Sequence, residues 1–223
     1  MKTLAFDIYD TLINTNGVIT TLHGMVGDKA ERFSRIWRNK QLEYSFRRGL
    51  MRNYRDFSVC VNDAFIYTCD YLQTPLDTEQ KKTLLNEYLI LPAFDDVRES
   101  LEGLQAEGHS LFAFSNGRTD AVDTLLSNAG IRDYFLNIIS ADDIKTFKPD
   151  PAMYTHFLNQ SGASTDNAWL ISSNPFDVIG AISANMKAAW VRRSKDNVFD
   201  PWGVEPTITV KSLSELSGAM ARE

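Results

Sequence analysis

The chain has 223 residues and a formal net charge of -6, from 29 acidic and 23 basic side chains. This length fits one large domain, or one domain that carries a smaller insert, and the acidic balance argues against nucleic acid as the main partner. No apolar run approaches the roughly 18 residues of a membrane span, and an acid at position 7 comes too early for a secretory signal. We therefore expect a cytoplasmic protein with no membrane partner. Two cysteines form no disulfide framework, and three scattered histidines make a zinc site or a His-based triad improbable.

A short apolar and aromatic run, Thr3–Tyr9, opens the chain and contains one acid, Asp7. Asp10-Thr11 and the turn residues Asn14–Gly17 follow it, so the run predicts a buried strand that ends in a loop. α/β proteins place their chemistry at the carboxyl ends of buried strands. Asp7 is therefore a candidate functional residue.

The next segment, from about residue 18 to residue 91, has helical patterns and no clear pair of strands. Apolar residues recur at helical spacing around Trp37, and Asp77–Gln80 has the pattern of a capping box that opens a helix. Pro92 marks the exit. We predict a helical cap domain at 16–92 and an α/β core domain made of 1–15 and 93–223.

After Pro92 the chain alternates helices with short apolar strands. We expect a helix capped by Asp95 and later helices after Gly117, at Pro149 and at Phe176. The predicted strands are Ser110–Ser115, Asn137–Ser140, Ala168–Ser172, Ala188–Val191 and Thr207–Val210. This alternation predicts an α/β fold, a doubly wound parallel sheet with helices on both faces.

Polar residues lie at or after the ends of four predicted strands, which are Thr3–Tyr9, Ser110–Ser115, Asn137–Ser140 and Ala168–Ser172. Because the carboxyl ends of parallel strands share one edge of the sheet, these residues should meet there. Each alone has an ordinary structural interpretation, such as a turn, a helix-terminal acid or a surface lysine, but their joint placement favours one site. They are Asp7, Thr11, Ser115, Asn116, Lys148, Ser172, Ser173, Asn174 and Asp177.

These motifs, in this order, resemble the haloacid dehalogenase superfamily over essentially the whole chain. The motifs are Phe6-Asp7-x-x-Asp10-Thr11-Leu12, Ser115-Asn116, Lys148-Pro149 and a final acid-bearing loop. The resemblance implies a Rossmann-like core with a cap inserted after the first motif. Most members are magnesium-dependent phosphatases with a second acid two residues after the nucleophile and a metal-binding Asp in the last motif. Here Tyr9 and Ser173 stand where carboxylates would be needed. Because Mg²⁺ needs several hard oxygen ligands, we expect no metal and no cofactor.

The details resemble the L-2-haloacid dehalogenases. The matching segments are Asp7–Thr11, Trp37–Tyr44, Ser115–Gly117, Lys148–Asp150 and Ser172–Asp177. The resemblance implies hydrolysis of short (S)-2-haloacids to (R)-2-hydroxyacids and halide through an aspartyl ester, in a homodimer. Three residues depart from that group's pattern: Asp10 is commonly Gly, Asn39 is often Gln and Phe176 is often Trp. These departures concern pocket size and substrate range more than the type of reaction.

The expected chemistry gives these residues roles. Asp7 would attack the halogen-bearing carbon, with its rotamer fixed by Thr11 and its charge maintained by Lys148. Arg38, helped by Asn116, would receive the halide, and Ser115 would hold the substrate carboxylate. Asn174 would place the hydrolytic water and Asp177 would activate it. Tyr154 completes the catalytic set, and Tyr9, Leu42, Phe57, Asn116, Ser172 and Phe176 form the substrate-binding set. Two alternatives stay open: a magnesium-dependent phosphatase of the same superfamily, and a non-catalytic binding module.

Overall fold

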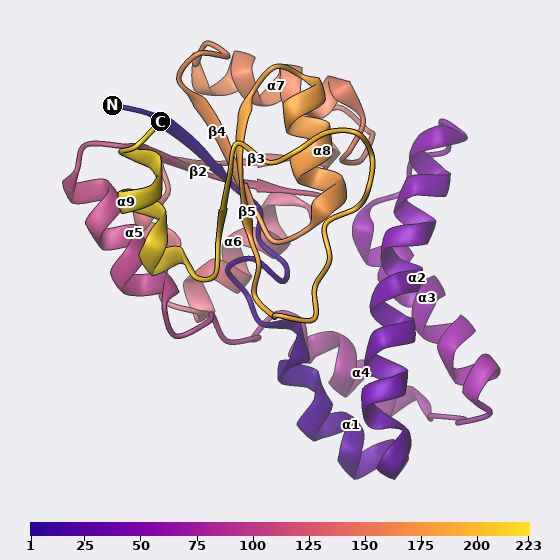
Figure 1. Ribbon diagram of the computed structural model, residues 1–223. Coiled ribbons are helices and arrows are strands. Elements are labelled where there is room, and N and C mark those ends of the chain that lie inside the picture. The colour runs from indigo at the N-terminus through magenta and orange to yellow at the C-terminus, as the bar shows by residue number, and fades with distance from the viewer.

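The computed structural model describes residues 1–223, and its centre is a six-stranded, fully parallel sheet (Figure 1). The strands are β1 (Thr3–Phe6), β2 (Ser110–Ser115), β3 (Asn137–Ser140), β4 (Ala168–Ser172), β5 (Lys187–Val191) and β6 (Ile208–Val210), in the spatial order β3-β2-β1-β4-β5-β6. The chain winds outward in one direction through β2 and β3, then in the other through β4, β5 and β6. The predicted doubly wound parallel sheet is confirmed. Its switch point lies at β1 and β4, and open sheets of this kind bind ligands there.

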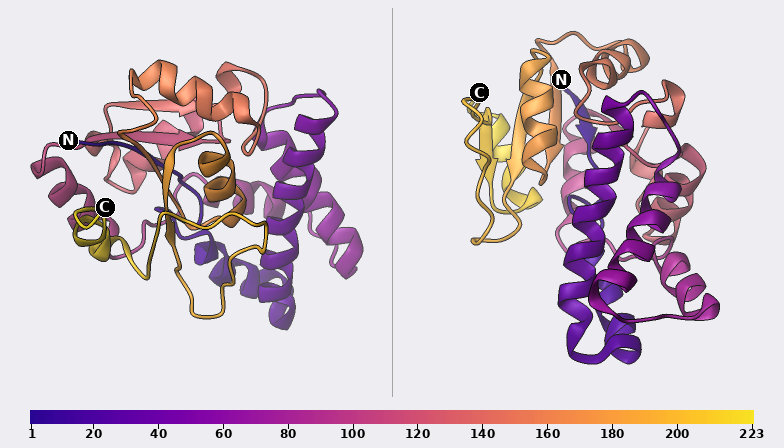
Figure 2. Two further views of the ribbon diagram at one scale, coloured as in Figure 1. Left: turned by 45° about the horizontal axis from the view of Figure 1, so that its top comes forward. Right: turned by 90° about the vertical axis from the view of Figure 1, so that its right-hand side faces the viewer.

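Helices cover both faces of the sheet, so the inner strands are buried on both sides. Figures 1 and 2 place α5, α6 and α9 on one face and α7 and α8 on the other. Every residue of β4 is buried, as are five of the six in β2, which is why these strands are nearly continuous apolar runs in the sequence. The helices are α5 (Val97–Ala106), α6 (Thr119–Asn128), α7 (Pro151–Ser161), α8 (Pro175–Ser183) and α9 (Leu216–Met220).

Four more helices occupy the segment between β1 and α5 and lie to one side of the sheet (Figure 1). They are α1 (Ile19–Val26), α2 (Ala30–Leu50), α3 (Phe57–Leu72) and α4 (Thr78–Glu87). Trp37 of α2 is fully buried, with ring centroids 5.4 Å from Phe65 and 4.8 Å from Tyr88. These aromatic contacts give the helical segment its own packing centre. We propose on this basis that residues 16–92 form the cap and that 1–15 and 93–223 form the core.

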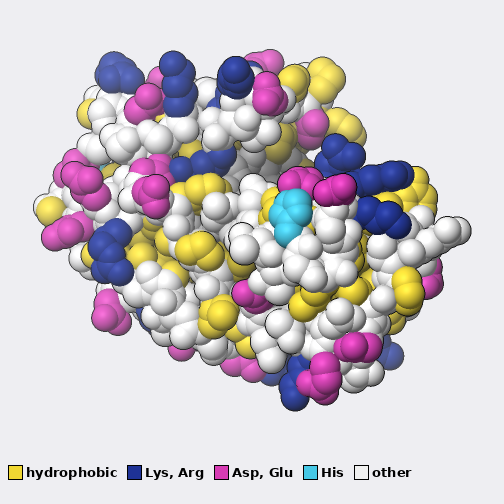
Figure 3. Space-filling view, turned by 90° about the horizontal axis from the view of Figure 1, so that it is seen from below, with side chains coloured by type: hydrophobic (Ala, Val, Ile, Leu, Met, Phe, Trp, Pro, Cys, Tyr) yellow, Lys and Arg dark blue, Asp and Glu magenta, His cyan; other side chains and the backbone are white.

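Short 3-10 turns complete the elements, and no helix combines the length and hydrophobicity that crossing a bilayer requires. The turns are Thr15–Val18, Gly27–Lys29, Arg132–Tyr134, Ala141–Asp143 and Leu213–Glu215. On the face drawn in Figure 3, Lys and Arg side chains are interspersed with Asp and Glu. That face offers no continuous basic surface for a nucleic acid.

Some predicted local features are confirmed and others are wrong. The capping box at α4 is present, with Gln80 N donating to Asp77 Oδ1 at 2.8 Å and Asp77 N donating to Gln80 Oε1 at 3.0 Å. The first strand ends at Phe6, so Asp7 lies in the loop that follows. Asp95 does not cap α5. The N-cap residue is Asp96, and its carboxylate accepts from Arg193 instead, at 2.7 and 2.8 Å.

A glycine fixes how closely α7 and α8 approach. A Cβ at Gly180 would lie 2.6 Å from Cζ and 2.7 Å from Cε2 of Tyr154, whose ring is fully buried and cannot move aside. We expect Gly180→Ala to lower the free energy of unfolding by about 1–3 kcal/mol, the usual effect of overpacking a core. Urea denaturation measures the change.

Gly103→Ala is the matched control, because Gly103 lies in α5 with no atom near the added Cβ. It should raise stability by about 1 kcal/mol through helix propensity. Equal effects of the two substitutions would contradict the packing argument.

Candidate active site

Asp7 is the first residue after β1 and is 6% exposed. Its Oδ1 accepts from Lys148 Nζ at 2.8 Å, and its Oδ2 accepts from Thr11 Oγ1 and Asn174 Nδ2, both at 2.7 Å, and from Ser172 Oγ at 3.3 Å. Burial opposes ionisation, but the Lys148 ammonium and these hydrogen bonds outweigh it and hold the pKa of Asp7 below its ordinary value of 3.8. Asp7 is therefore an ionised carboxylate in a nearly dry site.

Lys148 is 1% exposed and joins three parts of the sheet edge. Its Nζ donates to Asp7 Oδ1, to Asp177 Oδ2 at 2.6 Å and to the Phe114 carbonyl at 3.1 Å, which uses all three ammonium protons. Its backbone N donates to Asn116 Oδ1 at 2.8 Å. Burial opposes the charge, but the two carboxylates outweigh it and raise the pKa of Lys148.

Asp177 lies in the first turn of α8 and is fully buried. Besides Lys148, Tyr154 Oη donates to its Oδ1 at 2.8 Å. Burial raises the pKa of Asp177 to about 6, and the Asp7 charge adds to this, against the opposing effects of Lys148 and Tyr154. Two carboxylates on one ammonium thus differ in acidity, and Asp177 is the one able to take up a proton near neutral pH.

The loop after β4 fastens the loop after β1, which contains Asp7, to the core. Asn174 Nδ2 donates to the Tyr9 carbonyl at 3.1 Å as well as to Asp7, and its N donates to Ser172 Oγ at 3.1 Å. Ser173 N donates to Thr11 Oγ1 at 2.9 Å. The short polar residues of this loop therefore orient the Asp7 carboxylate and the turn that follows it.

One cation reaches this edge from the helical segment. Arg38 of α2 donates from Nε to Asp10 Oδ2 at 2.8 Å and from Nη1 to Gln41 Oε1 at 3.4 Å, and its guanidinium lies 5.7 Å from the Tyr9 ring centroid. Burial works against the charge, but Asp10 outweighs it and raises the pKa of Arg38. Arg38 is therefore a fixed cation beside the loop after β1.

Aromatic rings from both segments line the site. Tyr9 lies 6.0 Å from Phe57 and 6.4 Å from Tyr88 between ring centroids, and the three line a cavity of about 400 Å³ together with Gly117. Phe176 of α8 meets Phe46 of α2 at 5.0 Å. These rings close the space between the helical segment and the sheet.

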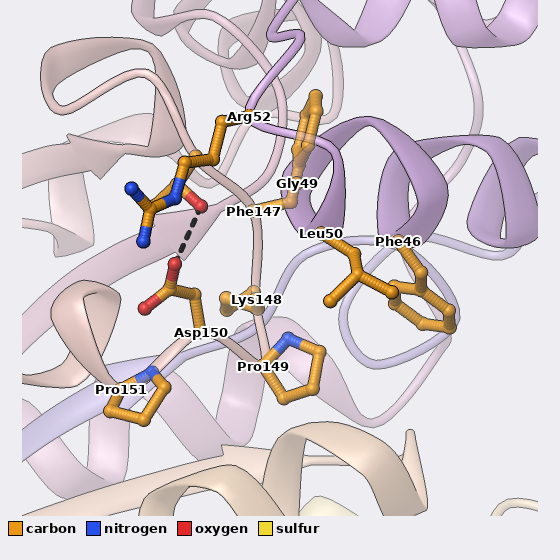
Figure 4. Close-up of a pocket in the computed structure, with 10 residues that line it drawn as sticks. Phe46, Gly49, Leu50, Arg52, Phe147, Lys148, Pro149, Asp150 and Pro151 are labelled. Carbon is orange, nitrogen blue, oxygen red and sulfur yellow. Dashed lines mark hydrogen bonds between the residues drawn. The ribbon is translucent and has the colours of Figure 1, made fainter.

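Two further cavities flank the network. One of about 470 Å³ has Phe46 and Leu50 of α2 on one side and Pro149 of the Lys148 loop on the other (Figure 4). The other, about 580 Å³, is lined by polar groups that include Asp10 and Asn174. Residues of the network or next to it, Lys148, Asn174 and Tyr9, therefore line three separate cavities.

Seven of the fourteen site residues predicted from the sequence meet in one network of side-chain hydrogen bonds. They are Asp7, Thr11, Lys148, Tyr154, Ser172, Asn174 and Asp177. Ser115 Oγ instead accepts from the neighbouring Gly117 N at 3.0 Å, and Asn116 Oδ1 accepts from the backbone N of Lys148 at 2.8 Å. Leu42 is half-buried on α2.

Sequence reasoning missed the contact of Asp10 with Arg38, and it missed Gln41 and Tyr88. Gln41 Nε2 donates to Tyr88 Oη at 2.9 Å in the buried interior. Gln41 sits inside the Trp37–Tyr44 segment that carried the family resemblance, so a signal existed for it. Tyr88 lies in an ordinary helical pattern and gave none.

The donor set does not fit Mg²⁺. Asp7 and Asp177 are the carboxylates of the network, and Lys148 Nζ binds both. No group of three or more His, Cys, Asp or Glu side chains is arranged to hold a metal ion. Mg²⁺ requires several oxygen ligands in octahedral geometry, and two carboxylates that are both bonded to an ammonium do not provide such a set.

Comparison with known proteins gives concordant matches. A family model described as haloacid dehalogenase-like hydrolase matches residues 1–185. The (S)-2-haloacid dehalogenase of Pseudomonas sp. (strain YL) is 34% identical over 213 residues, covering 96% of this chain and 91% of the relative. The haloacetate dehalogenase H-2 of Moraxella sp. (strain B) is 33% identical, with coverage of 97% and 96%.

Solved structures agree with these relatives. The L-2-haloacid dehalogenase from Xanthobacter autotrophicus with chloropropionic acid covalently bound superposes with a TM-score of 0.90 at 27% identity, covering all of this chain and 98% of the other. Sequence, fold and the family model converge, and the chain belongs to the haloacid dehalogenase-like hydrolases.

Proposed function

We propose that this protein is an (S)-2-haloacid dehalogenase, which converts short (S)-2-haloacids and water to (R)-2-hydroxyacids and halide without a metal. One observation carries the proposal. A buried, ionised Asp7 is held by Lys148, while Tyr9 and Ser173 occupy the positions where a phosphatase of this family needs carboxylates. Relatives at 34% and 33% identity are named (S)-2-haloacid dehalogenase and haloacetate dehalogenase, and the similar Xanthobacter structure holds chloropropionic acid covalently.

In the first step an oxygen of Asp7 attacks C2 of the substrate. A C–O ester bond forms as the carbon–halogen bond breaks, and the halide leaves with the electron pair. Arg38, assisted by Asn116, donates to the halide as its charge develops, and such donors lower the barrier. Ser115 and nearby backbone amides hold the substrate carboxylate. Attack from the side opposite the halide inverts C2.

In the second step water attacks the ester carbonyl of Asp7. Asn174 places the water, and Asp177 takes its proton. The tetrahedral intermediate expels the 2-hydroxyacid oxygen, which takes the proton back from Asp177. The other water proton leaves to solvent as Asp7 is regenerated as a carboxylate, and C2 is untouched. Thr11 and Ser172 hold the Asp7 carboxylate at 2.7 and 3.3 Å.

Two further groups support this chemistry from outside the reacting atoms. Tyr154 orients Asp177 through its 2.8 Å hydrogen bond. The walls formed by Tyr9, Leu42, Phe57 and Phe176 limit bulk water during the first step, so that free water does not compete with Asp7 for the substrate.

The two alternatives fit less well. A magnesium-dependent phosphatase needs carboxylates at positions that hold Tyr9 and Ser173, and Lys148 already bonds both Asp7 and Asp177. A non-catalytic binding module has no need for two buried carboxylates whose pKa values are displaced in opposite directions.

One turnover in H₂¹⁸O with excess enzyme tests the proposed reaction. (S)-2-chloropropionate should give chloride and unlabelled (R)-lactate, and the label should appear in the peptide containing Asp7, because the product oxygen comes from that carboxylate. The yield should survive excess EDTA. Label in the product on the first turnover, or rescue of an EDTA-treated sample by Mg²⁺, would contradict the proposal.

The base role of Asp177 predicts a pH dependence. Because its pKa is raised to about 6, the ionised form is lost as pH falls through that value, and kcat should fall with it. Asp177→Asn should release halide once per active site and then stop, with the ester on Asp7 detectable by intact mass. A flat pH profile between 5 and 7 together with full turnover by Asp177→Asn would remove Asp177 from the second step.

We also propose a cytoplasmic homodimer that associates through cap helices. Exposed apolar side chains on this segment support it, since Leu50, Met51 and Tyr71 are 88%, 69% and 56% exposed. The two cysteines are free, which suits a reducing compartment. Light scattering should give twice the chain mass, and Leu50→Glu should lower it; a monomer mass for the unaltered protein would contradict the dimer.

A further inference from the structure

Asp10 has an unusual backbone conformation and three partners in different parts of the chain. Its φ is +66°, in the left-handed region. Its Oδ2 accepts from Arg38 Nε at 2.8 Å, its Oδ1 accepts from Thr15 Oγ1, and its carbonyl accepts from Ser173 Oγ at 2.9 Å. Asp10 thus connects the loop after β1 to Thr15 at the start of the helical segment, to α2 and to the loop after β4.

We propose that Asp10 is a positioning residue for the dehalogenation proposed above: it holds the Arg38 guanidinium through Nε and so directs the Nη1–Nη2 end toward the departing halide. This inference rests on the proposed function.

The hydrogen bonds of Arg38 fit this role. Nε is taken by Asp10, Nη1 makes only a long 3.4 Å contact to Gln41, and Nη2 donates to no protein group. The donors left over are therefore on Nη1 and Nη2, at the end of the guanidinium. The guanidinium is planar, so a hydrogen bond at Nε restricts the direction in which this Nη1–Nη2 end points.

The anchoring of Asp10 makes it a rigid support. Each carboxylate oxygen has its own partner. The backbone is also held on both sides, since Asp10 N donates to the Ile13 carbonyl and the Asp10 carbonyl accepts from Ser173 Oγ, both at 2.9 Å. The Arg38 and Asp10 side chains are only 14% and 31% exposed, so solvent screens their attraction less than at an open surface.

The charge of Asp10 has a second consequence. The substrate is an anion, and a carboxylate next to Arg38 offsets part of the attraction that the guanidinium would exert on it. Removing Asp10 should therefore not weaken substrate binding, although it misplaces Arg38. The expected signature is a fall in the rate of carbon–halogen cleavage with an unchanged or lower KM.

The test compares Asp10→Gly with the unaltered enzyme in single turnovers. Glycine accepts φ +66° without strain, so the fold should be kept, which circular dichroism verifies. First-turnover chloride release from 2-chloropropionate should fall about 10- to 100-fold, the scale of one hydrogen bond to a charged group. Bromide release from 2-bromopropionate should fall less, because bromide is the better leaving group and depends less on donors. Asp10→Asn, which also tolerates this φ, should show the same pattern more weakly.

Two variants serve as references. Arg38→Lys should lose ~10²-fold or more, on the scale of removing a transition-state donor, and so marks the upper limit for Asp10→Gly. Tyr54→Phe removes a different contact between the helical segment and the core, the 2.9 Å hydrogen bond from Tyr54 Oη to Asp142 Oδ1, and leaves Arg38 untouched. It should change neither halide rate.

The outcomes separate the two proposals. If the unaltered protein releases no halide, the proposed function fails and the role of Asp10 fails with it. If it is active and Asp10→Gly matches its chloride rate, or loses both halides equally, only the role of Asp10 is overturned. A Tyr54→Phe variant that reproduced the chloride-selective loss would also overturn it, because loosening the two segments would then suffice.

Discussion

Everything at the candidate site depends on a buried ammonium shared by two carboxylates. Lys148 lies 2.8 Å from Asp7 and 2.6 Å from Asp177, and all three side chains are nearly or fully removed from water. Charges buried this deeply are tolerated only with close partners and satisfied hydrogen bonds, and each group here has both. The arrangement has a net negative charge if both acids ionise, so one of them must be the weaker acid. Asp7, with donors from Thr11 and Asn174 as well, stays ionised, and the pKa of Asp177 rises to about 6. In the proposed reaction, this asymmetry would supply an ionised nucleophile and a neighbouring base from the same residue type.

The parallel sheet is what allows three distant segments to meet around that ammonium. Asp7 follows β1, the Phe114 carbonyl belongs to β2, and Asp177 follows β4, all at one edge of the sheet. Because β1 pairs with both β2 and β4 in register, a shift in either pairing would move one acceptor away from Lys148. The core strands therefore set the distances of the site as well as the stability of the fold.

The sequence predicted this part of the molecule well, and for a physical reason. Strands buried on both faces are continuous apolar runs, so β2, β3 and β4 were found at their observed bounds, and strand ends mark where the loops converge. Side-chain partners across segments were not predictable in the same way. The sequence around Asp96 did not indicate that its carboxylate would bind Arg193 rather than cap the N-terminus of α5. The spacing of Asp10 and Arg38 did not indicate a contact either, because that contact depends on how α2 lies against the core. The hydrogen bond between Gln41 and Tyr88 could not be predicted for the same reason, because it depends on how α2 packs against the end of α4.

The residue at position 9, two after Asp7, distinguishes the proposed dehalogenation from the hydrolysis of phosphate esters. An acid there would add a second carboxylate near Asp7, and several carboxylate oxygens together suit a hard cation. Tyr9 instead places a ring beside Phe57 and Tyr88 and beneath the Arg38 guanidinium. Burial raises the pKa of its phenol to about 12, so at neutral pH it adds no negative charge. A neutral apolar wall on one side and a fixed guanidinium on the other favour a small electrophile that releases a monovalent anion, and they disfavour a phosphate ester, whose higher charge needs more cations than Lys148 and Arg38 provide.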